Sequence, residues 1–176
     1  MTVLVLGIGN LLLQDEGIGV RIVQEIQRRY HLPAEVEVLD GGTAGMELID
    51  ALADKTQVIV IDAVRTGQPP GTPVRLAGSA VPVFFQQRIT PHQLGIADVL
   101  ATLTLAGKVP PHLVLIGMVP YATELSLTLS AEVEGQVETL VAMVITELAG
   151  LGIRLSAKAP VSSPSAYYSM ESNVTD

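Results

Sequence analysis

The chain has 176 residues, which is enough for one domain with a buried core. Hydrophobic residues make up 48% of it but aromatic residues only 3%, so the core must consist mainly of aliphatic side chains. This composition suits buried parallel strands with helices on both faces. The formal net charge of −8 repels phosphate backbones, and we therefore expect no nucleic-acid binding.

Membrane contact and thiol chemistry are also not expected. The chain has no basic amphipathic stretch, and no apolar run approaches the roughly 20 residues that cross a bilayer. A strand is predicted at the very start, with no positively charged leader before it, so we expect a cytoplasmic protein without a signal peptide. The absence of cysteine excludes disulfides and thiolate ligands, which leaves His, Asp and Glu for any metal site.

Three short apolar runs, at residues 3–6, 36–39 and 58–61, predict buried strands. A helix is predicted between the first two strands, and residues 31–33 are expected to end it. Its hydrophobic stripe is formed by Ile18, Ile22, Val23, Ile26 and Tyr30. A shorter helix is predicted before the third strand, and its inward-facing residues are Leu48, Ile49 and Leu52. This alternation of strands and helices predicts right-handed crossovers and a parallel sheet.

The middle of the chain begins with a loop at residues 66–73, after which residues 74–76 favour a short antiparallel edge strand. Residues 78–89 fit neither pattern and are left unassigned. Thr90, Pro91 and Gln93 have the pattern of a helix start, as N-cap, first helical residue and third residue of a capping box. The predicted inner face of this helix is formed by Leu94, Ala97, Leu100 and Ala101.

A further buried strand at residues 113–116 is followed by a loop over 118–130 and then by the clearest helix of the chain. The stripe of this last helix is formed by Val133, Val137, Leu140, Val141, Val144 and Leu148. Gly150 is its expected C-cap. We expect residues 157–176 to be a mobile, Ser-rich tail. The prediction is a single three-layer α/β domain over residues 1–156, with a twisted, mainly parallel sheet between helices.

Polar residues lie where the predicted strands end, and open α/β sheets bind ligands beyond the carboxyl ends of their strands. Glu16 follows the first strand, Asp40 the second and Asp62 the third, while His92 opens a later helix. The positive end of a helix favours the neutral imidazole, which is the form that binds metals. Because two carboxylates and one imidazole suit a first-row divalent ion, we predict a metal site of Glu16, Asp62 and His92.

Each of these residues also has a purely local explanation. The helix dipole favours a carboxylate such as Glu16 at a helix N-terminus. Asp40 and Asp62 are common residues in turns and N-caps. His92 also fits a partly exposed side chain without a role, and the spacing of the three residues does not by itself show that they meet.

The glycines near the N-terminus allow two interpretations. Gly17 and Gly19 each cost about 1 kcal/mol relative to Ala inside a helix, so they indicate either a ligand close to the backbone or tight packing of helix on sheet. Residues 7–9 are similar to a dinucleotide-binding loop, with Asp40 as the acid that would bind the ribose. Leu12, however, stands where that pattern requires Gly or Ala. A nucleotide-binding domain therefore remains an alternative.

Taken together, these segments resemble the family of hydrogenase maturation endopeptidases, in the same order from residue 1 to about residue 150. The first and longest motif is VLGIGNLLLQDEGIGV at residues 5–20. The other motifs are DGGTAG at 40–45, IDA at 61–63, GQPPG at 67–71, HQLG at 92–95 and LIG at 115–117. The resemblance implies an endopeptidase built on a mainly parallel sheet with helices on both sides.

The resemblance also implies a substrate and a metal. The substrate would be the precursor of a nickel–iron hydrogenase large subunit, whose C-terminal extension is removed after nickel insertion. Glu16, Asp62 and His92 would contact the metal and serve as the catalytic set. We expect the nickel ion to be supplied by the precursor, so that the free enzyme is metal-free, and we expect a monomer.

The resemblance further implies that Asp40, Gly41, Gly42 and Thr43 recognise the substrate. The sequence does not decide whether Asp40 or Glu16 accepts a proton during the reaction. A second alternative also stays open, in which the same metal set serves a non-catalytic nickel-sensing or chaperone module for hydrogenase assembly.

Overall fold

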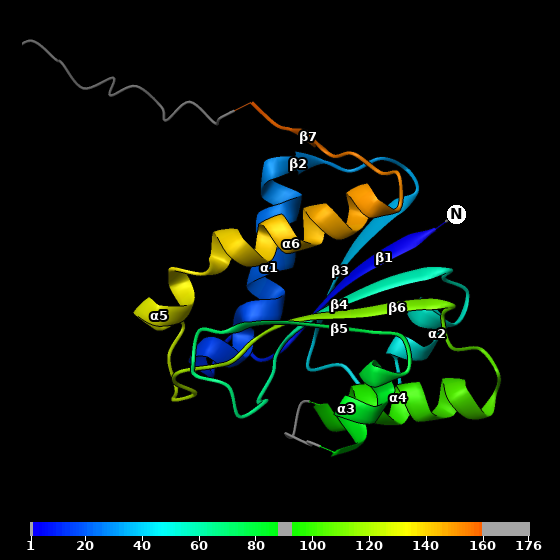
Figure 1. Ribbon diagram of the computed structural model, residues 1–176, viewed down its shortest axis with the longest axis horizontal. Coiled ribbons are helices and arrows are strands. Elements are labelled where there is room, and N and C mark those ends of the chain that lie inside the picture. The colour runs from blue at the N-terminus through cyan, green and yellow to red at the C-terminus, as the bar shows by residue number, and fades with distance from the viewer. Residues whose placement is uncertain (1, 88–92, 160–176) are drawn as a thin grey trace, which may run out of the picture.

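The computed structural model describes residues 2–87 and 93–159, and a five-stranded sheet lies at its centre (Figure 1). Its strands are β1 (Val3–Ile8), β3 (Val36–Gly42), β4 (Gln57–Ala63), β5 (Pro73–Ala77) and β6 (His112–Met118). The strand order is β3-β1-β4-β6-β5. The strands β3, β1, β4 and β6 are parallel, and β5 is antiparallel to β6 at the edge of the sheet. This confirms the predicted mainly parallel sheet with an antiparallel edge strand.

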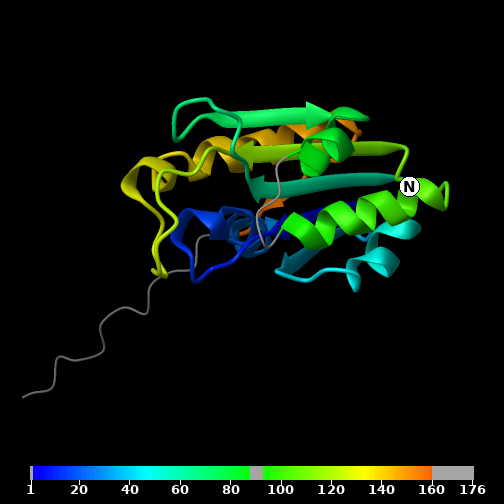
Figure 2. The same ribbon diagram turned by 90° about the horizontal axis from the view of Figure 1, so that it is seen from below.

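Helices cover both faces of the sheet (Figures 1 and 2). One face carries α1 (Ile18–Arg29) and α6 (Val137–Gly150), and the other carries α2 (Leu48–Ala53), α3 (Ala80–Gln87) and α4 (Gln93–Leu105). Successive residues of β1 alternate between two hydrophobic clusters, with Val3 and Val5 in one and Leu4 and Leu6 in the other. Both faces are thus buried, which explains why the strands are continuous apolar runs.

The shorter elements join these layers at their ends. They are η1 (Gln14–Gly17), β2 (Tyr30–His31), α5 (Ala131–Glu134) and β7 (Ser156–Ala157). The strand β2 corrects the predicted first helix, which ends at Arg29 instead of including Tyr30. Tyr30 pairs with Ala157 across an antiparallel bridge, and the Lys158 amide donates to the Arg29 carbonyl at 2.7 Å. The predicted boundary between residues 156 and 157 therefore falls inside β7, and residues 160–176 lie outside the described residues.

The second half of the chain contains two further corrections. The unassigned residues 78–89 include α3, and the inner face predicted for α4 is confirmed only in part, at Leu100 and Ala97. The fully buried residues of α4 are Ile96, Val99, Leu100 and Leu103, whereas Ala97 and Ala101 are half-buried. The side chain of Leu94 lies outside the described residues. Because α4 contacts α2 and α3 as well as the sheet, its hydrophobic surface is broader than one stripe.

The predicted last helix is divided into α5 and α6, which Gly135 and Gln136 separate. All six residues of its predicted stripe are buried, so the stripe itself is confirmed. Gly150 is the last helical residue rather than the C-cap, which is Leu151, and Gly152 takes up the positive φ of 82°. The helix therefore ends one residue later than predicted when Gly150 is taken as the C-cap.

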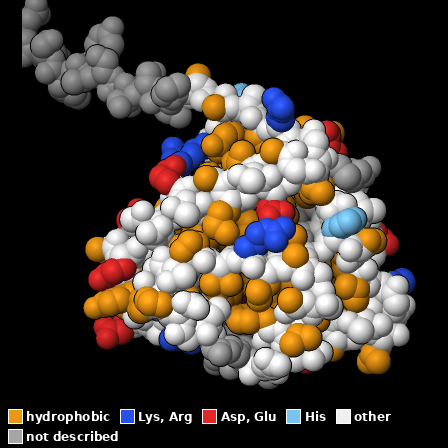
Figure 3. Space-filling view, in the orientation of Figure 1, with side chains coloured by type: hydrophobic (Ala, Val, Ile, Leu, Met, Phe, Trp, Pro, Cys, Tyr) orange, Lys and Arg blue, Asp and Glu red, His pale blue; other side chains and the backbone are white. Residues whose placement is uncertain are grey.

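The outer surface beside α6 mixes charged and hydrophobic side chains. Arg75 on β5 and Glu147 on α6 form an ion pair there. Figure 3 shows basic and acidic side chains next to each other on this face, among hydrophobic ones. Every helix in the described part of the chain is too short or too polar to cross a lipid bilayer.

The first turn of α1 lies directly on the carboxyl ends of β1 and β4. A Cβ atom on Gly19 would lie 2.1 Å from the Ile61 carbonyl oxygen and 2.3 Å from that of Ile8. A Cβ atom on Gly7 would lie 2.3 Å from the Gly19 carbonyl oxygen. These two glycines therefore serve tight packing of helix on sheet, which decides between the two interpretations of Gly19. Gly17 is also closely packed, but against the loop after β1, since its Cβ would lie 2.9 Å from the Cα of Leu11.

We predict that Gly19→Ala lowers the free energy of unfolding by about 2 kcal/mol or more, because the new methyl group overlaps backbone atoms that cannot move aside. The matched control is Gly150→Ala in α6, where nothing lies within 4 Å of the new Cβ and stability should rise by up to about 1 kcal/mol. Urea unfolding of both variants measures the effect. Equal stability of Gly19→Ala and the wild type would contradict the close contact.

Candidate functional site

Glu16 lies in η1, which is folded back over the end of β1. The Asn10 amide donates to the Glu16 carbonyl oxygen at 3.2 Å. Gly9 has a φ of +137°, and a Cβ there would lie 1.9 Å from the same oxygen, so only glycine fits. The Glu16 residue is only 6% exposed although it lies at the rim of the sheet. Its carboxylate is thus held by the backbone at the carboxyl end of β1.

Asp62 is the second-last residue of β4 and is fully buried. Its Oδ1 accepts a hydrogen bond from the Ala63 amide at 2.8 Å. Ile61 and Ala63 belong to the cluster under α1 and α6, so alternation places the Asp62 side chain on the side of α3 and α4. The strand ends at Ala63, two residues later than predicted, so Asp62 lies within it rather than after it.

The two carboxylates lie at the same edge of the sheet, Asp62 within β4 and Glu16 in η1, which follows the neighbouring strand β1. β1 pairs with β4 in parallel, with Gly7 opposite Ile61, and η1 lies against the end of β4. Arg65, which follows β4, approaches Glu16 with 3.4 Å between Nη2 and Oε1. The chain leaves β1 toward β3 and leaves β4 toward β6, so the strand order reverses between these two strands. Open α/β folds bind their ligands at such a reversal.

Asp40 to Thr43 form the end of β3 and the residue that follows it. The strand runs to Gly42 rather than ending at residue 39 as predicted, because a bulge continues the pairing. Asp40 is opposite Gly7 and Gly42 is opposite Ile8, so Gly41 is the extra residue. Asp40 is exposed, and its Oδ1 accepts from the Gly42 amide at 2.9 Å. Gly42 itself has a φ of +47°.

His92 lies outside the described residues, so its predicted role is not tested. The described part of α4 begins with Gln93, and its first turn reaches the same edge of the sheet. A Cβ on Gly95 would lie 2.6 Å from the Cα of Gly45, in the loop after β3. The described residues alone contain no group of three His, Asp or Glu side chains that fits a metal ion. The set of Glu16, Asp62 and His92 therefore stays a prediction.

Asp15 has a structural role that the sequence did not reveal. Its carboxylate is fully buried and accepts four hydrogen bonds from the segment between β6 and α6. Oδ2 accepts from the Tyr121 and Ala122 amides, at 2.9 and 2.8 Å, and from the Ser130 hydroxyl at 2.8 Å. Oδ1 accepts from the Ser130 amide at 2.8 Å. Asp15 thus fastens the loop after β6 to η1, directly beside Glu16.

Comparisons with known proteins agree with this geometry. The family model of hydrogenase maturation proteases matches residues 20–147. Hydrogenase 2 maturation protease of Escherichia coli (strain K12) is 45% identical over 154 residues, which cover 87% of this chain and 94% of that protein. The solved structure of the hydrogenase maturating endopeptidase HybD from E. coli has a TM-score of 0.87 at 44% identity, covering 90% of this chain and 98% of that one. The hydrogenase expression/formation protein HupD of Rhodobacter capsulatus is 41% identical over 162 residues, which cover 91% of this chain and 77% of HupD.

The chain belongs to the hydrogenase maturation protease family. It is therefore an endopeptidase, and its reaction is the hydrolysis of a peptide bond. Membership of this family, and not the glycines, speaks against the alternative of a nucleotide-binding domain. Two of the glycines make close contacts within the chain: Gly7 lies against Gly19 and Gly9 against Glu16. Leu12 is 55% exposed and takes no part in these contacts.

The other two histidines of this maturation protease do not belong to the site. His31 is exposed in β2, and His112 is exposed at the start of β6, at the opposite edge of the sheet. Among the described residues, the candidate site consists of Glu16, Asp62 and the segment from Asp40 to Thr43, and His92 stays a predicted member.

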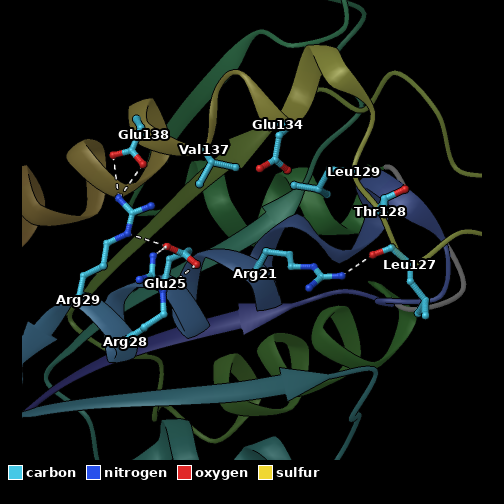
Figure 4. A pocket seen from close by; sticks show the side chains of 10 residues that line it. All are labelled: Arg21, Glu25, Arg28, Arg29, Leu127, Thr128, Leu129, Glu134, Val137 and Glu138. Carbon is cyan, nitrogen blue, oxygen red and sulfur yellow. Dashed lines mark hydrogen bonds and ion pairs between the residues drawn. The ribbon is translucent and has the colours of Figure 1, made fainter. Parts of the chain in front are cut away.

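A separate pocket of about 690 Å³ lies between α1 and the segment from Leu127 to Glu138 (Figure 4). Its basic side chains are already engaged: Arg28 and Arg29 both bond Glu25, and Arg29 also reaches Glu138. The hydrogen bond from Arg28 is the main cause that holds the pKa of Glu25 below its ordinary value. Because these charges are balanced within the pocket, it is less suited to hold an ion than the edge of the sheet.

We predict that Asp15→Asn lowers the free energy of unfolding by about 1–3 kcal/mol, because one buried backbone donor then faces an amide group instead of an oxygen. Asp15→Ala should cost more, since four donors lose their acceptor. Glu124→Gln, an exposed acid in the same loop, is the control and should stay within about 0.5 kcal/mol of the wild type. Chemical unfolding compares the three variants. A surface substitution usually changes the free energy of unfolding by no more than about 0.5 kcal/mol. A change as small as that for Asp15→Asn would contradict the proposed role of Asp15.

Proposed function

We propose that this protease removes the C-terminal extension from the precursor of a nickel–iron hydrogenase large subunit and recognises the nickel ion that the precursor already holds. Membership of the family supports the choice of substrate. One observation supports recognition of the metal: two carboxylates with almost no exposure, Glu16 and Asp62, lie at the same edge of the sheet on either side of the strand reversal. Carboxylate oxygens are ligands that divalent metal ions accept, so a pair of them at one edge of the sheet suits this role.

The two acids and His92 would form an incomplete coordination shell. Two carboxylates and one imidazole suit a first-row divalent ion and leave positions open for the substrate. The Ala63 amide orients Asp62 by its hydrogen bond to Oδ1, as outer partners do for many metal ligands. In the free enzyme Arg65 forms an ion pair with Glu16. We expect the half-exposed Arg65 side chain to turn toward solvent when nickel binds. The free enzyme would then hold no metal of its own.

The segment from Asp40 to Thr43 would recognise the precursor next to this site. Asp40 and Thr43 are exposed at the same edge, and the bulge at Gly41 lies between them. The Gly9 amide donates to the Gly42 carbonyl at 2.9 Å, which joins this segment to the end of β1. A carboxylate at this position, Asp40, is suited to bind a donor group of the substrate chain.

The chemistry follows from what these residues supply. Cleavage requires that a water oxygen attacks the scissile carbonyl carbon, that the C–N bond breaks and that the leaving nitrogen gains a proton. A bound nickel ion would polarise the carbonyl or the water. Asp40 or Glu16 would accept the proton from the water, and the geometry does not choose between them. The proposal keeps a monomeric, cytoplasmic enzyme.

We predict that the purified enzyme cleaves a nickel-loaded precursor and leaves the nickel-free precursor intact, because the ion completes the recognition site. Glu16→Gln and Asp62→Asn should each reduce cleavage by at least about 100-fold, the upper range for loss of an outer partner of a metal ligand. Mass spectrometry of the precursor reports the loss of the C-terminal peptide. His92→Ala belongs in the same series.

Two controls make this result specific. Glu35→Gln, an exposed acid directly before β3 at the opposite edge of the sheet, should cleave at the rate of the wild type. Thermal unfolding of each variant shows that the fold is kept. Equal cleavage of both forms of the precursor would reject recognition through nickel, and binding without any cleavage would favour the non-catalytic module.

A further inference from the structure

Three large hydrophobic side chains are exposed beside the candidate site, and together we call them the leucine patch: Leu12, Leu125 and Leu127. Their exposed fractions are 55%, 83% and 63%. They come from two loops far apart in sequence, one after β1 and one after β6. Figures 1 and 2 show that these loops lie side by side at the carboxyl end of the sheet. Clustered exposed apolar side chains on a monomer mark an interaction surface.

Backbone hydrogen bonds hold the two loops together at the patch. The Ser126 amide donates to the Leu12 carbonyl at 3.0 Å, and the Gln14 amide donates to the Ser126 carbonyl at 3.0 Å. A parallel bridge joins Leu13 to Ser126 between them. The three leucines therefore flank one short bridge and form a single surface.

This surface is held rigidly although it contains almost no regular structure. The four hydrogen bonds to Asp15 fix the loop on either side of Leu125 and Leu127. Arg21 on α1 donates to the Leu127 carbonyl, as Figure 4 shows. Gln14 keeps a φ of 51°, a conformation that persists in a non-glycine residue only where its surroundings enforce it. A rigid loop presents its side chains to a partner without an ordering cost on binding.

We propose that the leucine patch binds an apolar segment of the hydrogenase precursor and thereby holds the cleavage point over Glu16 and Asp62; this rests on the function proposed above. The patch is tied to the segment that carries Glu16: Leu12 lies in the loop that leads to η1, and Asp15 in η1 binds the loop of Leu125 and Leu127. A metal contact alone fixes one point of a substrate, whereas a protease must also orient the chain that it cuts. An apolar contact next to the ion supplies the second point.

A second copy of this chain is a less suitable occupant. The chain has a formal net charge of −8, so two copies repel each other. Three leucine side chains also expose far less surface than the roughly 2,000 Å² or more that obligate dimers bury. A small apolar surface is typical of a transient complex, which a protease and its substrate must form because the product has to leave.

The test compares the double variant Leu125→Ser/Leu127→Ser and the single variant Leu12→Ser with the wild type. The control is Leu105→Ser, which removes an equally exposed leucine, 91% exposed, from the far end of α4. The double variant should raise KM for the nickel-loaded precursor about tenfold, which corresponds to about 1.4 kcal/mol, and leave kcat within about twofold. Leu12→Ser should have a smaller effect in the same direction, and Leu105→Ser should have none.

Binding is measured separately from cleavage, by titrating the enzyme with fluorescently labelled, nickel-loaded precursor. If the wild type binds the precursor but does not cleave it, the proposed function fails. The Kd of the double variant then still shows whether the leucine patch contributes to binding. An unchanged KM and Kd in the double variant overturns the inference, and so does a loss of kcat alone. Absence of any binding by the wild type overturns both proposals. Sedimentation that shows a dimer of the wild type and a monomer of the double variant assigns the patch to self-association and also overturns the inference.

Discussion

The close contact between the first turn of α1 and the ends of β1 and β4 determines where everything else in the site lies. No side chain fits at Gly7 or Gly19, so the helix backbone rests on the strand carbonyls. The chain must therefore turn back between Ile8 and Ile18, and η1 is the segment that makes this turn. Glu16 is buried at the rim because η1 is pressed against β1 and β4, and not because it caps a helix. The same contact places it next to the strand that carries Asp62.

Two neighbouring carboxylates in η1 have different tasks. Asp15 is saturated by four hydrogen bonds from the loop after β6, and it stabilises the fold. The backbone of Glu16 is fixed at the end of β1, and its carboxylate lies at the edge of the sheet with Arg65 at 3.4 Å. The loop that Asp15 fastens also carries Leu125 and Leu127, so the same residue links the stability of the fold to the surface proposed for the substrate.

The sequence predicted the parts of the fold that depend on local periodicity. The parallel strands, the inner faces of α1 and α2 and the stripe shared by α5 and α6 were predicted because each is buried in a regular pattern. The ends of elements were less certain: Asp40 and Asp62 read as strand ends, but pairing with β1 and β6 continues the strands past them. Asp15 was missed as an anchor because its partners, Tyr121 and Ser130, are 106 and 115 residues away. The broad contact surface of α4 likewise has no signal in a single stripe.

The central claim is that Glu16 and Asp62 face one metal ion together with His92. The most direct measurement is anomalous diffraction at the nickel edge from crystals of the wild-type enzyme soaked with nickel. The account predicts one strong peak within bonding distance of a Glu16 oxygen, an Asp62 oxygen and a ring nitrogen of His92. A peak bound to other side chains, with Glu16 and Asp62 turned to different neighbours, would contradict it.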